Sequence, residues 1–216
     1  MTTGTDSLEL YWIPLGADTT VVRLSGRVYE TITAALGRRP RCDLYHAALV
    51  ASRGDIRITV EVAPVPDDDG RERRGVVGDG PVGSALLGRW RVFRYEIRRW
   101  SGGSIPDLRH AVDSPRLLST DPVEIAGALE QLAQVPTPVW GRDELGLGEM
   151  WNSNSVIAWT LASSGLLSAD LTPPRGGRAP GWDAGGELAR RDRPSQSFEA
   201  NRTRPESVAT HTLPSG

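Results

Sequence analysis

Backbone-breaking residues constrain this chain more than any other feature of its sequence, because 24 glycines and 16 prolines occupy 40 of its 216 positions. Glycine is conformationally flexible and proline has no amide hydrogen, so both residues tend to end helices and strands. We therefore expect short strands and helices joined by long loops. With 38% hydrophobic residues, the chain is still long enough to bury a sizeable core. The sequence predicts an ordinary globular domain.

Four segments have the composition of β-strands, being rich in β-branched, aromatic and leucine residues. In the third of them, apolar residues alternate with polar ones, and Gly54 and Asp55 just before it suit a tight hairpin turn. The many arginines of the fourth suggest an edge strand or a solvated face. The predicted strands are residues 8–15, 42–52, 57–65 and 89–100.

Three further segments have the spacing and end signals of helices. Asp121 can cap one of them, because it is followed by proline at the first helical position. Asn152 or the next serine can cap another, and Gly165 lies just past its end. The predicted helices are residues 18–36, 121–135 and 152–164.

The chain divides into one domain, residues 1–185, and a tail, residues 186–216. For the domain we predict an α+β fold in which an antiparallel sheet packs against a few helices. Residues 66–88 are charged and glycine-rich with no sustained period, so we expect a mobile loop there. From Glu187 onward the apolar residues are scattered among charged and polar ones, and we predict a disordered tail.

Composition excludes several classes of protein. The single cysteine, Cys42, cannot close an intramolecular disulfide, and with three histidines it cannot form a zinc finger; no metal or cofactor is expected. Arginine supplies all 25 basic residues, but 27 acidic residues leave no basic footprint for nucleic acid. No window is apolar enough to span a membrane, and the start lacks a signal peptide, so we expect a cytoplasmic protein.

Two features suggest chemistry rather than packing. One is His46, inside a predicted strand, and the other is the polar run at residues 152–155, where a predicted helix begins. Unpaired amides and the helix dipole favour negative charge at a helix start, which suits a nucleophile. A histidine on a nearby strand can take the proton of that nucleophile, and a third polar residue can orient the ring. In this chain the three candidates are Ser153, His46 and Glu61.

This order of residues resembles the circularly permuted papain-like hydrolases of the NlpC/P60 superfamily, over about residues 8–182. In that group a strand histidine precedes a nucleophile at a helix start, which often reads Asn-Cys-Asn-Ser followed by an apolar residue. Here residues 152–156 read Asn-Ser-Asn-Ser-Val, so Ser153 stands where the family has cysteine. The resemblance implies a permuted papain-like fold and a cleft for amide or ester substrates, such as peptides, isopeptides, cell-wall peptides or acyl-lipids.

Serine in place of cysteine argues against catalysis. A thiol with a pKa of about 8.5 ionises at a helix end, whereas a hydroxyl does not. We therefore predict a catalytically degenerate domain that binds a peptide, acyl or protein ligand in the cleft between His46 and Ser153. The alternative is an active hydrolase with Ser153 as nucleophile, His46 as base and Glu61 as orienting group. Substrate-binding candidates are Asn152, Asn154, Trp151 and Trp140. The oligomeric state stays open.

Each candidate also has a simpler structural interpretation. His46 can be a partly buried strand histidine, Asn152 and Ser153 can be helix caps, and Glu61 can face solvent. The tryptophans can pack into the core. Cys42 is not a candidate nucleophile, because four residues along a strand separate it from His46 by about 13 Å.

Overall fold

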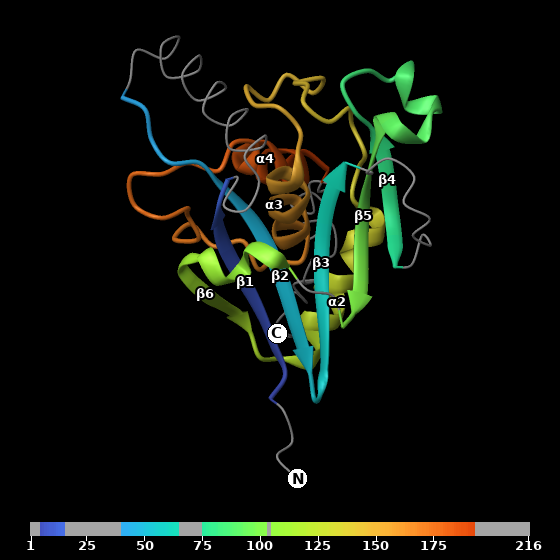
Figure 1. Ribbon diagram of the computed structural model, residues 1–216. Helices are drawn as coiled ribbons and strands as arrows, with labels where there is room; N and C mark the ends of the chain where they lie inside the picture. Colours follow the sequence, from blue (N-terminus) through green and yellow to red (C-terminus); the bar gives the residue numbers. More distant parts are fainter. Residues whose placement is uncertain (1–4, 16–39, 65–74, 103–104, 193–216) are drawn as a thin grey trace, which may run out of the picture.

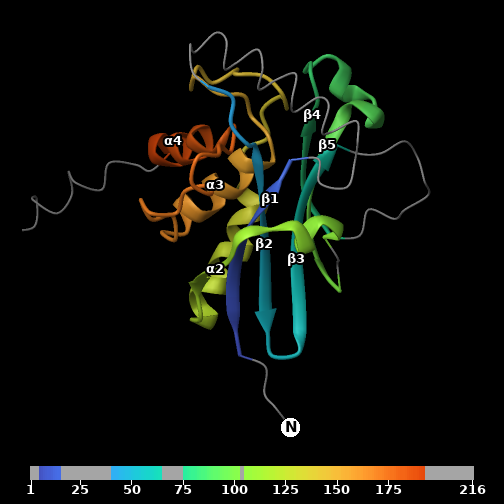
Figure 2. The same ribbon diagram turned by 60° about the vertical axis from the view of Figure 1, so that its left-hand side comes forward.

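A computed structural model describes residues 5–15, 40–64, 75–102 and 105–192. Within these ranges six strands form one antiparallel sheet, and three α-helices pack together on one of its faces (Figure 1). The turned view in Figure 2 shows these helices on the same side of the sheet. The predicted α+β class, with an antiparallel sheet packed against a few helices, is confirmed. The relation to papain-like hydrolases stays a prediction.

The strand order is β4-β5-β3-β2-β1-β6, which makes β4 and β6 the edge strands of the described sheet. The predicted tight turn at Gly54 and Asp55 joins β2 to β3, and Gly54 adopts a positive φ of 56° that favours glycine. The strands are β1 (Ser7–Pro14), β2 (Tyr45–Arg53), β3 (Ile56–Pro64), β4 (Val76–Pro81), β5 (Arg94–Ser101) and β6 (Val112–Ser119). The helices are α2 (Pro122–Gln131), α3 (Ser153–Ser163) and α4 (Trp182–Asp192), with short 3₁₀ helices η1 (Leu87–Arg89), η2 (Arg91–Phe93), η3 (Pro106–His110) and η4 (Leu132–Gln134).

The hydrophobic core lies between the sheet and the three helices. Because side chains alternate along a strand, every second residue of a strand faces the helices. In β1 these residues are Leu8, Leu10 and Trp12, each at most 1% exposed. Trp12 meets Trp182 at the start of α4 edge to face, with ring centroids 4.8 Å apart. The contact ties the last described helix to the sheet.

The end signals of α2 and α3 act as the sequence predicts. The Asp121 side chain accepts a hydrogen bond from the Val123 amide at 2.7 Å, with proline at the first helical position. Asn152 caps α3, and Gly165 follows the helix with a φ of 77°. Local sequence therefore fixes where both helices begin.

The prediction of a loop over residues 66–88 is wrong for β4, which pairs with β5 along residues 76–81. The glycines that suggested a loop are needed for close packing: a Cβ on Gly80 would lie 2.6 Å from the Tyr95 ring. Gly78 likewise faces the Ile97 side chain, where an added Cβ would lie at 3.3 Å. Glycine thus marks a close approach between strands here, not a flexible segment.

The predicted strand 89–100 begins later, at Arg94, after the 3₁₀ turn η2. It also lies between β3 and β4, so the suggestion of an edge strand is wrong. Two of its arginines form ion pairs: Arg94 lies 2.7 Å from Asp79, and Arg98 lies 2.6 Å from Glu96, which is 3% exposed. Such pairing lets charged side chains occupy an interior strand.

Besides β4, one further strand and one α-helix were not predicted from the sequence. One is the edge strand β6, and the other is α4, which continues to Asp192 with Leu188 and Ala189 buried. The predicted disorder from Glu187 is therefore wrong for residues 187–192. The predicted helix over residues 18–36 and the tail beyond residue 192 lie outside the described residues.

Candidate functional site

A nucleophile was predicted at the start of α3. There, side chains of the helix start itself pair with the first backbone amides. The Asn152 side chain accepts a hydrogen bond from the Asn154 amide at 2.8 Å and also from the Ser155 amide, while the Asn152 amide donates to Ser155 Oγ at 3.1 Å. This reciprocal pattern is a capping box. The Val156 amide donates to the Asn152 carbonyl at 3.2 Å. Most amides of the first turn are therefore already paired and do not form an anion site.

Asn154 connects α3 to two other parts of the fold. Its side chain is 3% exposed, and its Oδ1 accepts a hydrogen bond from the Ala47 amide at 2.7 Å. Its Nδ2 donates to the carbonyl of Tyr45 at 3.1 Å and to that of Pro180 at 2.9 Å. A predicted substrate-binding residue thus joins β2, α3 and the segment before α4, and its polar atoms are used inside the protein.

Both α4 and the segment leading into it pack closely against the same helix start. A Cβ on Gly181, whose φ is 85°, would lie 2.6 Å from Ser155 Oγ. A Cβ on Gly185 would lie less than 3.0 Å from the Ser155 carbonyl oxygen. The Gly181 amide also donates to Glu149 Oε2 at 2.7 Å, and burial raises the pKa of Glu149. These contacts describe a tightly packed junction.

His46 lies on β2 but faces away from this junction. Its neighbours Tyr45 and Ala47 belong to the core cluster beneath the helices, so alternation directs His46 to the opposite face of the sheet. Burial there lowers the pKa of His46 from 6.5 to about 4, which keeps the ring neutral near pH 7. Among the described residues, no hydrogen bond joins His46 to Ser153. Asn154, next to Ser153 in the sequence, bonds to the backbone on both sides of His46, and the pairing of His46 with Ser153 stays a prediction.

Glu61, the predicted orienting residue, is solvent-exposed on β3. Its partner in the sheet register is Arg98 of β5. Glu61 shares the sheet face of His46, because its neighbour Val60 belongs to the core on the other face. In the ranges that the structure covers, no hydrogen bond connects Glu61 with His46. Its simpler interpretation, a solvent-facing strand residue, fits this position.

The two tryptophans predicted to line a cleft serve as packing residues. Trp151 is 2% exposed and belongs to the core cluster. Trp140 pairs through its backbone with the end of β4: its amide donates to the Pro81 carbonyl at 2.9 Å, and its carbonyl accepts from the Gly83 amide at 3.0 Å. The Trp140 ring lies 5.2 Å from that of Tyr95. Trp140 thereby supports the connection between β4 and β5.

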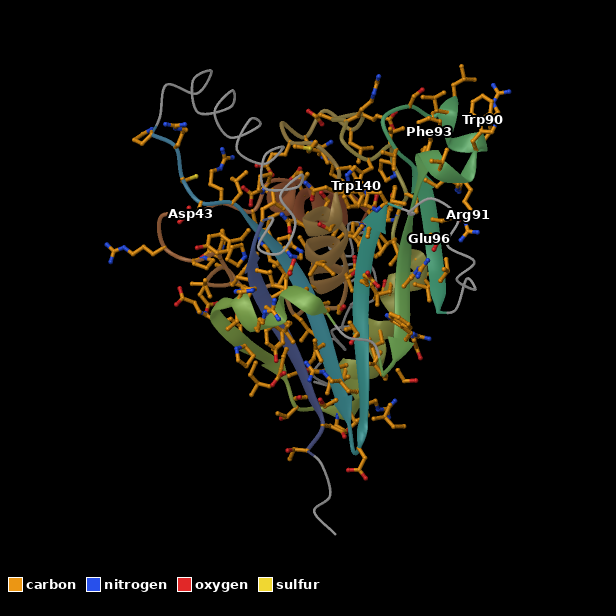
Figure 3. All side chains as sticks on the ribbon, in the orientation of Figure 1. Asp43, Trp90, Arg91, Phe93, Glu96 and Trp140 are labelled. Carbon is orange, nitrogen blue, oxygen red and sulfur yellow. The ribbon has the colours of Figure 1, made fainter. Side chains whose placement is uncertain are left out.

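That connection carries a surface that sequence reasoning missed. Residues 84–93, with the two 3₁₀ turns η1 and η2, project from the β4–β5 end of the sheet (Figure 1), and we call them the apolar protrusion. Figure 3 shows Trp90 and Phe93 at this outer end, while Trp140 lies nearer the middle of the molecule. Its large apolar side chains are strongly exposed: Leu86 by 67%, Leu87 by 37%, Trp90 by 51%, Val92 by 50% and Phe93 by 40%.

The backbone of the apolar protrusion is held firmly although its side chains are exposed. The Val82 amide donates to the Phe93 carbonyl at 2.8 Å. Arg94 donates from Nη1 to the Gly88 carbonyl at 2.7 Å and from Nε to Asp79 Oδ2 at 2.8 Å. Gly88 is buried against Pro81, where an added Cβ would lie 2.5 Å from the proline Cβ. The exposed apolar side chains are therefore carried by a backbone that hydrogen bonds and packing hold in place.

The charges of the apolar protrusion have a single sign. No acidic residue occurs between Asp79 and Glu96, whereas Arg89 and Arg91 lie among the exposed apolar residues. The Arg89 guanidinium lies over the Trp90 ring, 5.0 Å from its centroid, in a cation–π contact. The sequence signal for this surface is the run LLGRWRVF, which also has the composition of a strand.

No protein-family model, curated protein or solved structure matches this chain. In the ranges that the structure covers, every helix is too short or too polar to cross a bilayer.

Proposed function

We propose that this chain is a non-catalytic binding domain that docks a partner protein through the apolar protrusion. The observation that carries the proposal is the exposure of five large apolar side chains, by 37 to 67%, on a firmly held backbone. Contiguous apolar surface of this kind marks interaction sites in proteins that are otherwise polar outside. The partner surface would present apolar side chains together with aspartate or glutamate, because the apolar protrusion carries only arginines as charges.

The geometry favours this function over hydrolysis. Proton transfer needs the base within hydrogen-bond reach of the nucleophile, and among the described residues no hydrogen bond joins His46 to Ser153; only burial shifts the pKa of His46. An oxyanion needs free amides, and the capping box of Asn152 and Ser155 occupies most of those in the first turn.

The composition and rigidity of the apolar protrusion also suit binding. Tryptophan and arginine are the residues most enriched among those that dominate binding energy, and here Arg89 and Trp90 already stack. Because hydrogen bonds hold the Phe93 and Gly88 carbonyls, the backbone loses little conformational entropy when a partner binds.

Selection of random peptides displayed on phage against the immobilised protein tests the proposal. We expect the enriched peptides to combine acidic and apolar residues, and Trp90→Ala to weaken their binding about 30-fold, as for a hot-spot residue. Ile56→Ser is the matched control, because Ile56 is also exposed, by 56%, but lies in the β2–β3 hairpin; it should bind normally. Failure to enrich any peptide, or equal binding by Trp90→Ala, would contradict the proposal.

A further inference from the structure

A hollow of about 330 Å³ lies beside the edge strand β6, and we call it the β6 hollow. Three separate segments line it: β6, the first turn of α2 and the loop that follows α3. The apolar protrusion belongs to the β4–β5 end of the sheet, and Figure 1 shows it and β6 on opposite sides of the molecule. The β6 hollow is therefore separate from the surface that we propose for docking.

The register of the sheet determines which β6 side chains reach the hollow. Arg116 pairs with Leu10 of β1, which belongs to the core beneath the helices, so Arg116 points to the helix side of the sheet. Leu118 also packs against this core. Leu117 pairs with Glu9 and points to the other side. The hollow thus lies on the helix side of β6, with the guanidinium of Arg116 as part of its wall.

The exposed lining of the β6 hollow is mainly polar, and its leucines lie deeper. Leu171 is only 5% exposed and belongs to the core. Leu118 and Leu166 are partly buried and pack against the same core. The charged lining residues are the better exposed ones: 80% of the Asp170 side chain and 42% of the Arg116 side chain are accessible. A ligand that fits this lining has charged groups on an aliphatic stem.

The charged side chains of the β6 hollow keep hydrogen-bonding capacity for a ligand. Glu124 Oε2 accepts a hydrogen bond from the Ser119 hydroxyl at 2.6 Å, and the carboxylate has a second oxygen that can accept. Arg116 Nη2 lies 3.9 Å from Asp170 Oδ2, well beyond the length of a charge-assisted hydrogen bond, about 2.8 Å. Among the described residues, Arg116 forms no hydrogen bond at all, although a guanidinium has five donors.

The loop after α3 holds its wall of the β6 hollow in place. The Leu166 amide donates to the Leu161 carbonyl at 2.8 Å, and the Leu171 amide donates to the Ser168 carbonyl at 3.2 Å. A hydrogen bond from the Ser168 side chain lowers the pKa of Asp170, so this carboxylate is ionised near pH 7. Because these bonds exist before binding, the wall loses little conformational entropy when a ligand enters.

We propose that the β6 hollow binds a free α-amino acid with a basic side chain, such as lysine. Two carboxylates and one guanidinium line the hollow, so a ligand with one net positive charge neutralises it. Arg116 and Asp170 lie side by side, as do the α-carboxylate and the α-ammonium that they bind. Glu124 accepts from the side-chain ammonium, and the methylene stem covers the leucines.

The size of the β6 hollow agrees with a ligand of this kind. Small-molecule sites have volumes of about 300 to 1,000 Å³, and 330 Å³ is at the lower end of this range. A single amino acid is therefore a better match than a larger ligand. This binding site is independent of the partner that docks on the apolar protrusion.

Titration of the ¹⁵N-labelled full chain with L-lysine, followed by NMR chemical shifts, tests the site. We expect saturable shifts in residues 116–118 and 165–171, with a dissociation constant of about 1 mM because the charged partners are exposed. L-norleucine lacks the side-chain ammonium, and Nα-acetyl-L-lysine lacks the α-ammonium, as does a C-terminal lysine of a peptide. Each should bind about 10-fold more weakly, because one charge-assisted hydrogen bond is lost.

Variants of the charged lining residues complete the test. Arg116→Gln, Glu124→Gln and Asp170→Asn should each weaken the binding of lysine about 10-fold. Glu130→Gln is the matched control, because Glu130 is an exposed carboxylate of α2 outside the hollow, and it should bind as the wild type does. Circular dichroism confirms that each variant is folded.

Four results would overturn this assignment. One is the absence of saturable shifts, and another is shifts that map outside the β6 hollow. The third is binding of L-norleucine or Nα-acetyl-L-lysine as tight as that of lysine, which for the acetylated compound would indicate the end of a peptide instead of a free amino acid. The fourth is an equal loss of binding in Glu130→Gln and Glu124→Gln.

Discussion

Replacing Gly185 by alanine should lower the free energy of unfolding by about 3 kcal/mol, the upper end of the usual cost of overpacking. The new Cβ would lie less than 3.0 Å from the carbonyl oxygen of Ser155, and that oxygen belongs to the backbone of α3. Backbone cannot rotate away as a flexible side chain can, so α4 must shift. Urea denaturation followed by circular dichroism measures the change.

Gly127 provides the matched control for this substitution. It lies within α2, and a Cβ there meets nothing within 4 Å. Because alanine is the better helix former, Gly127→Ala should stabilise the protein by about 0.5 to 1 kcal/mol. If Gly185→Ala were as harmless as Gly127→Ala, the close packing of α4 on the start of α3 would be disproved.

The second large effect concerns Asn154, whose replacement by alanine should cost about 3 kcal/mol or more of unfolding free energy. The change removes three buried hydrogen bonds and leaves the Ala47 amide and the Tyr45 carbonyl without this partner. Each buried polar group left unpaired costs about 1 to 3 kcal/mol. The same denaturation experiment measures the loss.

Ser153→Ala is the control for Asn154→Ala, because Ser153 is the neighbouring residue but is only partly buried. It should change the free energy of unfolding by less than about 0.5 kcal/mol, as surface substitutions usually do. Equal costs for the two variants would show that Asn154 does not hold the junction of β2, α3 and the segment before α4.

The sequence predicted correctly the elements that depend on interactions between residues close together in the chain. The predicted strands at residues 8–15, 42–52 and 57–65 correspond to β1, β2 and β3. In these segments buried and exposed side chains alternate, or apolar residues form a continuous run. α2 and α3 were predicted from their caps, since a cap hydrogen bond joins residues close in sequence. β4 was missed because its glycines are explained only by Tyr95 and Ile97 of the neighbouring strand. α4 was missed because few of its residues are apolar, although Trp182 and Leu188 are buried.

The candidate site also depends on contacts between residues far apart in the sequence, which local patterns do not predict. Residues 152–155 have the sequence both of a nucleophile position and of a capping box, and no local pattern separates the two. The distinction depends on Asn154 contacting Ala47, which lies 107 positions away in the sequence. The exposure of Trp90 is equally non-local, because the run LLGRWRVF would suit a buried strand. Sequence reasoning found the residues at the start of α3, and the fold determines what they do.

The central claim is that the start of α3 is a structural junction and that binding occurs elsewhere. The most direct test measures the pH dependence of alkylation of Ser153→Cys, in a Cys42→Ser background, with and without His46→Ala. A helix start alone can lower a thiol pKa below about 8.5. The comparison of the thiol pKa with and without His46 therefore shows whether the two residues form a pair. We predict the same thiol pKa in the presence and absence of His46. A thiol pKa that is strongly lowered with His46 and returns towards 8.5 without it would show an assembled catalytic pair and contradict the account.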